Sequence, residues 1–263
     1  MKQFLTISQK AFKRMAYYKA QNLLSIFTAL LGILMMQFFW RALYGENSVI
    51  HDTSVRQMLL YSSMSWFLNL FNHEEMQNEI LSDVKEGNFI CKLLYPVNYL
   101  FYMFSKSCGC HLWSFFFKGI PMLLFILLFV NPGLNLSAGS ILLFAVSAIL
   151  GNLILCALIM LLSLMSFTWI ETSGLFMLKD IMVTIFSGLI VPTWFYPQIL
   201  QRIVNVLPFQ YMLQVPLAIL CGRIAPDRAG SYIGMQAVWL LAMLLLLGLV
   251  WKKIAQKAES LGG

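Results

Sequence analysis

The stretch that decides the fold runs from Gly119 to Ile170 and reads GIPMLLFILLFVNPGLNLSAGSILLFAVSAILGNLILCALIMLLSLMSFTWI. It contains no charged residue, and it is more than twice as long as the roughly 20 apolar residues that one helix needs to cross a bilayer. Turn-forming residues interrupt it at Asn131–Asn135, which reads Asn-Pro-Gly-Leu-Asn. The stretch therefore predicts two membrane-spanning helices, at about 108–130 and about 139–168.

The composition of the whole chain also indicates a membrane protein. Of the 263 residues, 60% are hydrophobic and only 11% are charged, and the mean hydropathy is +0.76. A soluble domain carries roughly 25% charged residues, so this chain has too few polar side chains to cover a water-soluble globule. A soluble enzyme, a DNA-binding protein and a disordered chain are excluded, and we expect no nucleic-acid partner.

Three further charge-free segments predict spans at 20–40, 57–72 and about 231–251, and a largely apolar segment that contains Lys179 and Asp180 predicts one at about 176–192. The segment at 57–72 is short, so we expect it to recruit flanking residues, with Arg56 reaching the interface. The uncharged segment 203–222 contains Pro208 and Pro216, which interrupt a membrane helix. We therefore expect an all-α polytopic membrane protein with six transmembrane helices in one domain, 1–263, and a broken extracellular re-entrant hairpin at 193–222.

The distribution of basic residues predicts the orientation, because lysine and arginine collect on the cytoplasmic side. With six crossings both termini are cytoplasmic, and 13 of the 18 basic residues lie on that side; these include Lys85, Lys92, Lys106 and Lys118 around the connection between spans two and three. Residues 1–19 mix apolar side chains with lysines, which suits an interfacial helix; a solvated tail is the alternative. The expected location is the bacterial cytoplasmic (inner) membrane.

An acidic segment joins spans two and three. Glu75, Glu79 and Asp83 are spaced four apart, so a helix would place them on one face, and Gly87 can end that helix. Cytoplasmic loops of membrane proteins are usually basic. The segment 73–98 is either a solvated connector or, as we favour, a helix on which a soluble partner docks.

Polar residues also follow one face of span two. Ser62, Ser65, Asn69 and Asn72 are spaced three, four and three residues apart. Such a row inside a membrane either forms hydrogen bonds between helices or lines a wet cavity, and both can hold. The pattern makes this face a candidate lining for a substrate route.

The spans lack the residues that membrane catalysis or ion coupling would need. We find no buried carboxylate at mid-membrane, no nucleophile–base pair and no glycine-rich phosphate loop with its lysine. Cys108-Gly-Cys110-His111 lacks a second ligand pair nearby, so no metal site is expected. The chain is expected not to be an enzyme, and energy for active transport would come from another polypeptide.

Three stretches carry a resemblance to a known family. The first is Glu79–Ile90 followed by Leu93-Leu94-Tyr95-Pro96, the second is Ser166-Phe167-Thr168-Trp169-Ile170-Glu171, and the third runs from Ser187-Gly188-Leu189-Ile190-Val191-Pro192 through Pro208 and Pro216 to Cys221-Gly222. With these motifs the chain resembles the ABC-2 permease family, the membrane subunits of ATP-binding-cassette exporters of the second type. In this chain Lys85 is flanked by Asp83 and Glu86, whereas the family linker is often more basic.

The resemblance implies a coupling helix within 73–90 that seats on an ATPase subunit, and spans two and five lining the route. It also implies two ATP-binding-cassette ATPase subunits, which hold ATP and Mg, and a second permease that is identical or similar. This chain would bind no cofactor itself and would contact membrane lipid. The exported compound would be amphipathic or hydrophobic, such as a drug, a peptide or a lipid-like molecule, and it would leave by alternating access.

From spacing and resemblance together we expect two groups of functional residues. The ATPase-coupling group comprises Glu75, Glu79, Asp83, Lys85 and Gly87. The substrate-route group comprises Ser62, Ser65, Trp66, Asn69, Thr184 and Ser187. An accessory or channel-like membrane subunit without ATP coupling is the alternative function, and the sequence does not identify the exported compound.

Overall fold

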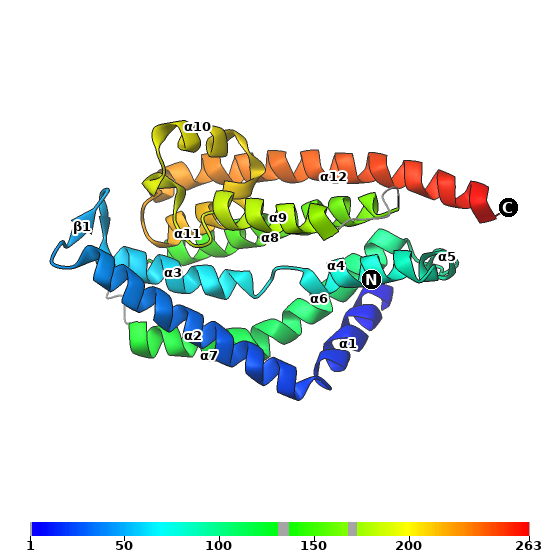
Figure 1. The fold of residues 1–263 in the computed structure, drawn as a ribbon, viewed down its shortest axis with the longest axis horizontal. Coiled ribbons are helices and arrows are strands. Elements are labelled where there is room, and N and C mark those ends of the chain that lie inside the picture. The colour runs from blue at the N-terminus through cyan, green and yellow to red at the C-terminus, as the bar shows by residue number, and fades with distance from the viewer. Residues whose placement is uncertain (1, 131–136, 168–172, 263) are drawn as a thin grey trace.

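The computed structural model describes residues 2–130, 137–167 and 173–262 of the chain. The predicted turn at Asn131–Asn135 and the end of the Ser166–Glu171 motif lie outside these residues. Most helices run along the long axis of the molecule, with β1 and α10 at one end and α4 and α5 toward the other, where both termini also lie (Figure 1). The described part of the chain is almost entirely helical, as the hydropathy predicts.

Four helices in the described residues are long and apolar enough to cross a membrane. They are α2 (Lys19–Tyr44), a continuous helix Tyr99–Val130, α8 (Ala138–Met165) and α12 (Pro226–Gly262). The second of these comprises α6 (Tyr99–Ser114), the π-helical turn η1 (Phe115–Gly119), α7 (Ile120–Phe125) and the π-helical turn η2 (Ile126–Val130). Each coincides with a predicted span.

Predicted spans two and five contain shorter helices, α3 (Val55–Asn69) and α9 (Ser173–Phe186). At 1.5 Å per residue these 15 and 14 residues measure about 22 and 21 Å, less than the ~30 Å of hydrocarbon. A capping box between Ser54 and Gln57 begins α3, which fixes where that helix can start. Six crossings therefore stay a prediction, with α3 and α9 as the two short members.

The N-terminal helix α1 (Lys2–Met15) packs against α6. Ser8 donates a hydrogen bond to the carbonyl oxygen of Ser105 at 2.7 Å, and a Cβ on Gly109 would lie 2.2 Å from the carbonyl oxygen of Ser8. The absence of a side chain at Gly109 thus lets the two backbones approach closely. Residues 2–15 are helical and held by protein contacts, and lipid contact by the remaining face of α1 stays a prediction.

The predicted hairpin region consists of short pieces: η3 (Thr193–Phe195), α10 (Gln198–Val206), η4 (Pro208–Tyr211) and α11 (Gln214–Leu220). Every residue of η4 and α11 is buried, whereas α10 is largely exposed. Both prolines lie near the beginning of their short helices, where a missing N–H costs little. The segment is therefore broken as predicted, and protein covers its inner part. A two-stranded antiparallel hairpin, β1 (Val49–Ile50) and β2 (Thr53–Ser54), lies at the same end.

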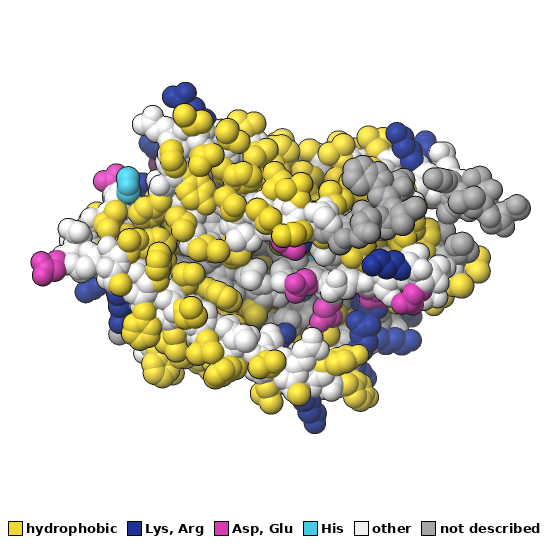
Figure 2. All heavy atoms as spheres, in the orientation of Figure 1, with side chains coloured by type: hydrophobic (Ala, Val, Ile, Leu, Met, Phe, Trp, Pro, Cys, Tyr) yellow, Lys and Arg dark blue, Asp and Glu magenta, His cyan; other side chains and the backbone are white. Residues whose placement is uncertain are grey.

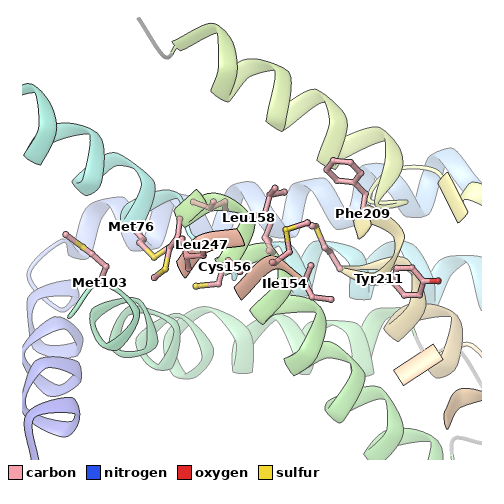
Figure 3. Close-up of a cluster of buried hydrophobic side chains, with 14 of the residues drawn as sticks. Met76, Met103, Ile154, Cys156, Leu158, Phe209, Tyr211 and Leu247 are labelled. Atoms are coloured by element: carbon pink, nitrogen blue, oxygen red, sulfur yellow. The ribbon is translucent and has the colours of Figure 1, made fainter. Parts of the chain in front are cut away.

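The largest buried cluster surrounds the middle of α8 and reaches from the hairpin to the acidic segment. Ile154, Cys156 and Leu158 of α8 lie between Tyr211 on one side and Met76 on the other (Figure 3). Leu247 of α12 joins the same cluster. Burial of these apolar side chains stabilises the fold. The cluster that they form extends from the hairpin to the acidic segment and so connects the two ends of the molecule.

One placement from the sequence is wrong. The charge distribution predicts Lys118 near the cytoplasmic connection between spans two and three, but Lys118 lies in η1, in the middle of the helix Tyr99–Val130. The helix begins at Tyr99 rather than near 108, and the side chain of Asn98 caps this start by accepting hydrogen bonds from the N–H groups of Leu100 and Phe101. Its first part, α6, packs against α1 and α4. Lys106 lies within α6.

Candidate functional site

The acidic segment forms two short helices between α3 and α6. The first, α4 (Glu74–Lys85), begins after His73, and the second, α5 (Asn88–Leu93), follows Gly87. Gly87 has a φ of +73°, and a Cβ there would touch nothing within 4 Å. The left-handed backbone, not crowding, is therefore what favours glycine at this position. Gly87 ends the acidic helix as the sequence predicts.

Five charged side chains from four helices form what we call the charge cluster: Arg14, Glu79, Asp83, Lys92 and Lys106. Glu79 accepts hydrogen bonds from Lys106 and, at 3.1 Å, from Lys92. Asp83 accepts one from Lys92 at 2.7 Å and one from the hydroxyl of Tyr99 at 2.9 Å. The cluster joins α4 to α1, α5 and α6.

The acidic row on α4 therefore points mainly into the protein. Asp83 is buried, and the side chain of Glu79 is 17% exposed. Glu75 is 48% exposed and lies 3.9 Å from Arg14. Lys85 and Gly87 are exposed. Of the predicted coupling residues, three are accessible to a partner and two are held inside the charge cluster; a coupling role for all five stays a prediction.

The charges within the cluster stabilise one another. Burial alone would raise the pKa of Glu79, but the hydrogen bonds and positive charges of Lys106 and Lys92 outweigh it, and its pKa lies below the ordinary value. Burial would likewise lower the pKa of Lys92, whereas Asp83 and Glu79 raise it above its ordinary value. Both groups are therefore held in their charged forms near neutral pH.

A cavity of about 800 Å³ adjoins the charge cluster. Its walls come from the end of α1, the first half of α2, the end of α3, most of α4, and the face of α6 and η1 from Met103 to Lys118. Figure 2 shows acidic side chains gathered near the junction of α3 and α4, on a face otherwise covered mostly by apolar side chains. A polar space of this size inside a membrane protein can hold water and a solute.

A hydrogen-bonded hub lies at the break between α3 and α4, in the cavity wall. The ring of His73 is buried, and its Nδ1 forms a hydrogen bond with the hydroxyl of Ser107 at 2.8 Å. Its Nε2 lies 3.2 Å from Oδ1 of Asn152, within hydrogen-bond distance. Asn152 in turn donates to the carbonyl oxygen of Phe71 at 2.8 Å. The hub ties the α3–α4 junction to α6 and α8. Spacing rules do not detect it, because His73 lies outside every periodic segment.

Two of the predicted route residues form hydrogen bonds to backbone instead of lining a cavity. The hydroxyl of Ser65 donates to the carbonyl oxygen of Leu189, and that of Ser62 donates to Leu59 within α3. Tyr61, beside them, donates to the carbonyl oxygen of Gly188 at 2.7 Å. The bonds of Tyr61 and Ser65 join α3 to the chain segment that follows α9.

The other predicted route residues are divided between two spaces. Trp66 and Asn69 line the large cavity, and Asn69 also borders a small cavity of about 80 Å³ on the α9 side, together with Thr184. Ser187 is fully buried. The structure thus brings Trp66 and Asn69 to the large cavity, which lies on the α2 and α6 side of α3. Transport past any of the six stays a prediction.

Sequence reasoning missed the partners of the acidic row. The basic residues Arg14, Lys92 and Lys106 were counted as part of a cytoplasmic excess, without assignment to any carboxylate. They lie 65, 13 and 27 positions from Glu79 in the chain, too far for a helical spacing rule. One feature of the sequence could have indicated these ion pairs. The acidic segment 73–98 lies on the predicted cytoplasmic side, where most of the basic residues also lie.

Comparison with known proteins assigns the family. A sequence model of the family described as "ABC-2 family transporter protein" matches residues 30–262, nearly the whole chain. No curated protein and no solved structure matches it. Members of this family are membrane subunits that normally work with ATP-binding-cassette partners. With its long apolar helices and the residues matched, the chain is a multi-pass membrane protein that belongs to the ABC-2 transporter family.

Proposed function

We propose that this chain is the permease subunit of an ATP-driven exporter, which moves an amphipathic or hydrophobic compound outward across the bacterial cytoplasmic membrane. ATP and Mg are bound by two copies of a separate ATP-binding-cassette ATPase. A second permease, identical or similar, completes the complex. The chain itself performs no catalysis in this proposal.

The observation that carries the proposal is the way α4 is tied to the rest of the molecule. The charge cluster joins α4 to α1, α5 and α6, and buried Lys179 of α9 donates a hydrogen bond to Gln77 of α4 at 2.8 Å. A displacement of this short segment would therefore reach α1, α6 and α9 together. This is the mechanical property that a coupling segment needs, because interactions on one surface must shift several helices.

The segment also presents an exposed tip, formed by Leu94, Tyr95 and Pro96, at the end of the molecule opposite β1. Leu94 is 82% exposed and Tyr95 is 50% exposed. Adjacent apolar side chains left in water are typical of an interaction site. We place the ATPase contact on this tip, on Lys85 and Gly87 where α4 meets α5, and on Glu75 in the first turn of α4, with Glu79 and Asp83 transmitting the displacement from inside.

The test is co-purification with a candidate ATP-binding-cassette ATPase, sought first among the genes adjacent to the one that encodes this chain. The two proteins are co-expressed, isolated through a tag on this chain, and assayed for vanadate-sensitive ATP hydrolysis. The variant Leu94→Asp should lose the ATPase. Val49→Asp is the matched control, because Val49 is 54% exposed and lies at the other end of the molecule.

The outcomes separate the two functions. Stoichiometric recovery of the ATPase with wild type and Val49→Asp, and loss with Leu94→Asp, supports the permease. Recovery of no ATPase with wild type in mild detergent contradicts it and favours an accessory or channel-like subunit. Reversal of the exposed acid, Glu75→Lys, should reduce stimulated hydrolysis while leaving the complex recoverable.

A further inference from the structure

Lys118 differs from the other basic residues that line the large cavity. Arg14, Lys92 and Lys106 each lie within 4.0 Å of a carboxylate oxygen. Among the residues that the structure describes, no carboxylate oxygen lies that close to the ammonium group of Lys118. The chain therefore supplies this lysine with no direct counter-charge.

The position of Lys118 makes an unpaired charge costly. The axial distance from Lys118 to the end of its helix at Val130 is about 18 Å at 1.5 Å per residue, and from Lys118 back to Tyr99 it is about 28 Å. A hydrocarbon layer of ~30 Å that ends near Val130 therefore contains Lys118. Ionisable side chains at this depth are rare and usually face a wet cavity that has a function.

Four of the described acidic residues line the same cavity, and none forms an ion pair with Lys118. Glu74 accepts a hydrogen bond from Asn72 at 3.4 Å, and the charge of Glu75 acts on Lys118 only from beyond 4.0 Å. Glu79 and Asp83 are bound within the charge cluster, and Glu75 lies 3.9 Å from Arg14. The local backbone is also unusual, because Lys118 belongs to the π-helical turn η1, a form that is rare and frequent at functional sites. Lys118 is thus presented to the cavity with its charge available to a ligand.

The surroundings of Lys118 are amphipathic. Ser114, one turn earlier, and Thr28 of α2 line the same cavity. Phe116 of η1 and Phe27 of α2 lie close to them in the chain, are more than half exposed and do not line the cavity, so an apolar ligand chain or lipid tail could lie against them. A charged and hydroxyl-bearing wall beside aromatic side chains suits a molecule with an anionic head and an apolar body.

We propose that Lys118 binds the anionic group, a phosphate or a carboxylate, of an amphipathic molecule whose apolar part lies against the exposed aromatic side chains of α2 and η1. Binding there requires neither ATP nor a partner chain, so it is measured separately from the proposed export function; a transported amphiphile as the occupant would rest on that function, whereas a lipid would not. The same chemistry would be met by an anionic membrane lipid or by a transported amphiphile.

The test measures binding to the purified full chain in nanodiscs of phosphatidylcholine, with a fluorescent dodecyl phosphate as probe and empty nanodiscs as background. Dodecanol carrying the same fluorophore is the uncharged comparison. We expect Lys118→Gln to weaken binding of the phosphate about tenfold or more, because it removes the charge-assisted hydrogen bond. Lys118→Arg should retain binding, and Lys85→Gln, which removes an exposed lysine outside the cavity, should leave it unchanged.

Repeating the titration in nanodiscs that contain phosphatidylglycerol distinguishes the two sources. If the lipid reduces dodecyl phosphate binding to wild type, the occupant is an anionic lipid; if it does not, the occupant is another amphiphile. Equal phosphate binding by wild type and by monodisperse Lys118→Gln would overturn the proposal. Should that variant fail to fold, equal affinity of wild type for dodecyl phosphate and dodecanol would overturn it as well.

Discussion

Two polar regions at opposite ends of the molecule are built in different ways. Where α8 meets the hairpin, the contacts are neutral: the amide of Gln236 donates to the carbonyl oxygens of Ser147 and Tyr211 at 3.0 and 2.8 Å, and all its bonds are buried. At the α4 end the contacts are ion pairs around a cavity of about 800 Å³. One region is tightly packed and uncharged, and the other is open and charged.

The difference assigns a different role to each end. Neutral hydrogen bonds to backbone need no water and leave little freedom for rearrangement, which suits a scaffold at membrane depth. Ion pairs beside a water-accessible space can exchange partners at lower cost, since water can solvate each charge during the change. We therefore expect the hairpin end to remain fixed while the α4 end moves.

The largest expected effect is at the neutral end, with Gly151→Ala. A Cβ at Gly151 would lie 2.4 Å from the carbonyl oxygen of Met212 and 2.8 Å from that of Tyr211. Both atoms belong to backbone, so the helix α8 and the hairpin must separate, and we expect a loss of about 3 kcal/mol in stability. The measurement is the thermal unfolding midpoint of the detergent-solubilised chain, followed by size-exclusion chromatography.

Gly234→Ala is the control, because a Cβ at Gly234 of α12 meets nothing within 4 Å. It should keep or slightly raise the midpoint, since alanine favours a helix by roughly 0.5–1 kcal/mol over glycine. The spacings Ser147/Gly151 and Gly230/Gly234 look alike in sequence, but only the first lies at a close helix contact. If Gly151→Ala unfolds at the wild-type temperature, the hairpin is not rigidly packed on α8.

The same contrast explains what the sequence could predict. The positions of most spans follow from charge-free runs such as Gly119–Ile170, because charged side chains are rare within the hydrocarbon of a bilayer. The interruption at Pro208 was predictable, because proline chemistry is local. The orientation of Glu79 toward the protein interior was not predictable. A spacing of four residues shows which side chains share a helix face, but it does not show what that face contacts. Lys106, which donates a hydrogen bond to Glu79, belongs to α6, and α6 lies against α4 only in the folded chain.

The second prediction concerns the charged end, with Glu79→Gln. The substitution removes the charge that Lys106 and Lys92 face, and charge-assisted hydrogen bonds in a largely buried site are worth about 2 kcal/mol. The pKa of Glu79 is lowered in the folded protein from an ordinary value of 4.5. Its contribution is therefore present above that pH and is lost as the pH falls through the folded-state value.

The measurement is the unfolding midpoint of wild type and Glu79→Gln from pH 7 downward. The two midpoints should differ near neutral pH and converge as the pH falls through the folded-state pKa of Glu79, which lies below 4.5. Glu46→Gln, an exposed acid before β1, is the control and should follow wild type throughout. A constant difference between wild type and Glu79→Gln at every pH would show that packing, and not ionisation, sets the role of Glu79.

The smallest effect on stability is expected for Glu75→Gln. Glu75 and Arg14 are each nearly half exposed and lie 3.9 Å apart, so water screens the pair and its loss should change stability by less than about 0.5 kcal/mol. This makes Glu75 the residue that separates folding from coupling. If the unfolding midpoint is unchanged and ATPase stimulation falls, the exposed edge of α4 contacts the partner while the inner acids hold its position. If the midpoint falls as far as with Glu79→Gln, the charge cluster extends to Glu75, and the boundary between the held and the accessible acids lies elsewhere on α4.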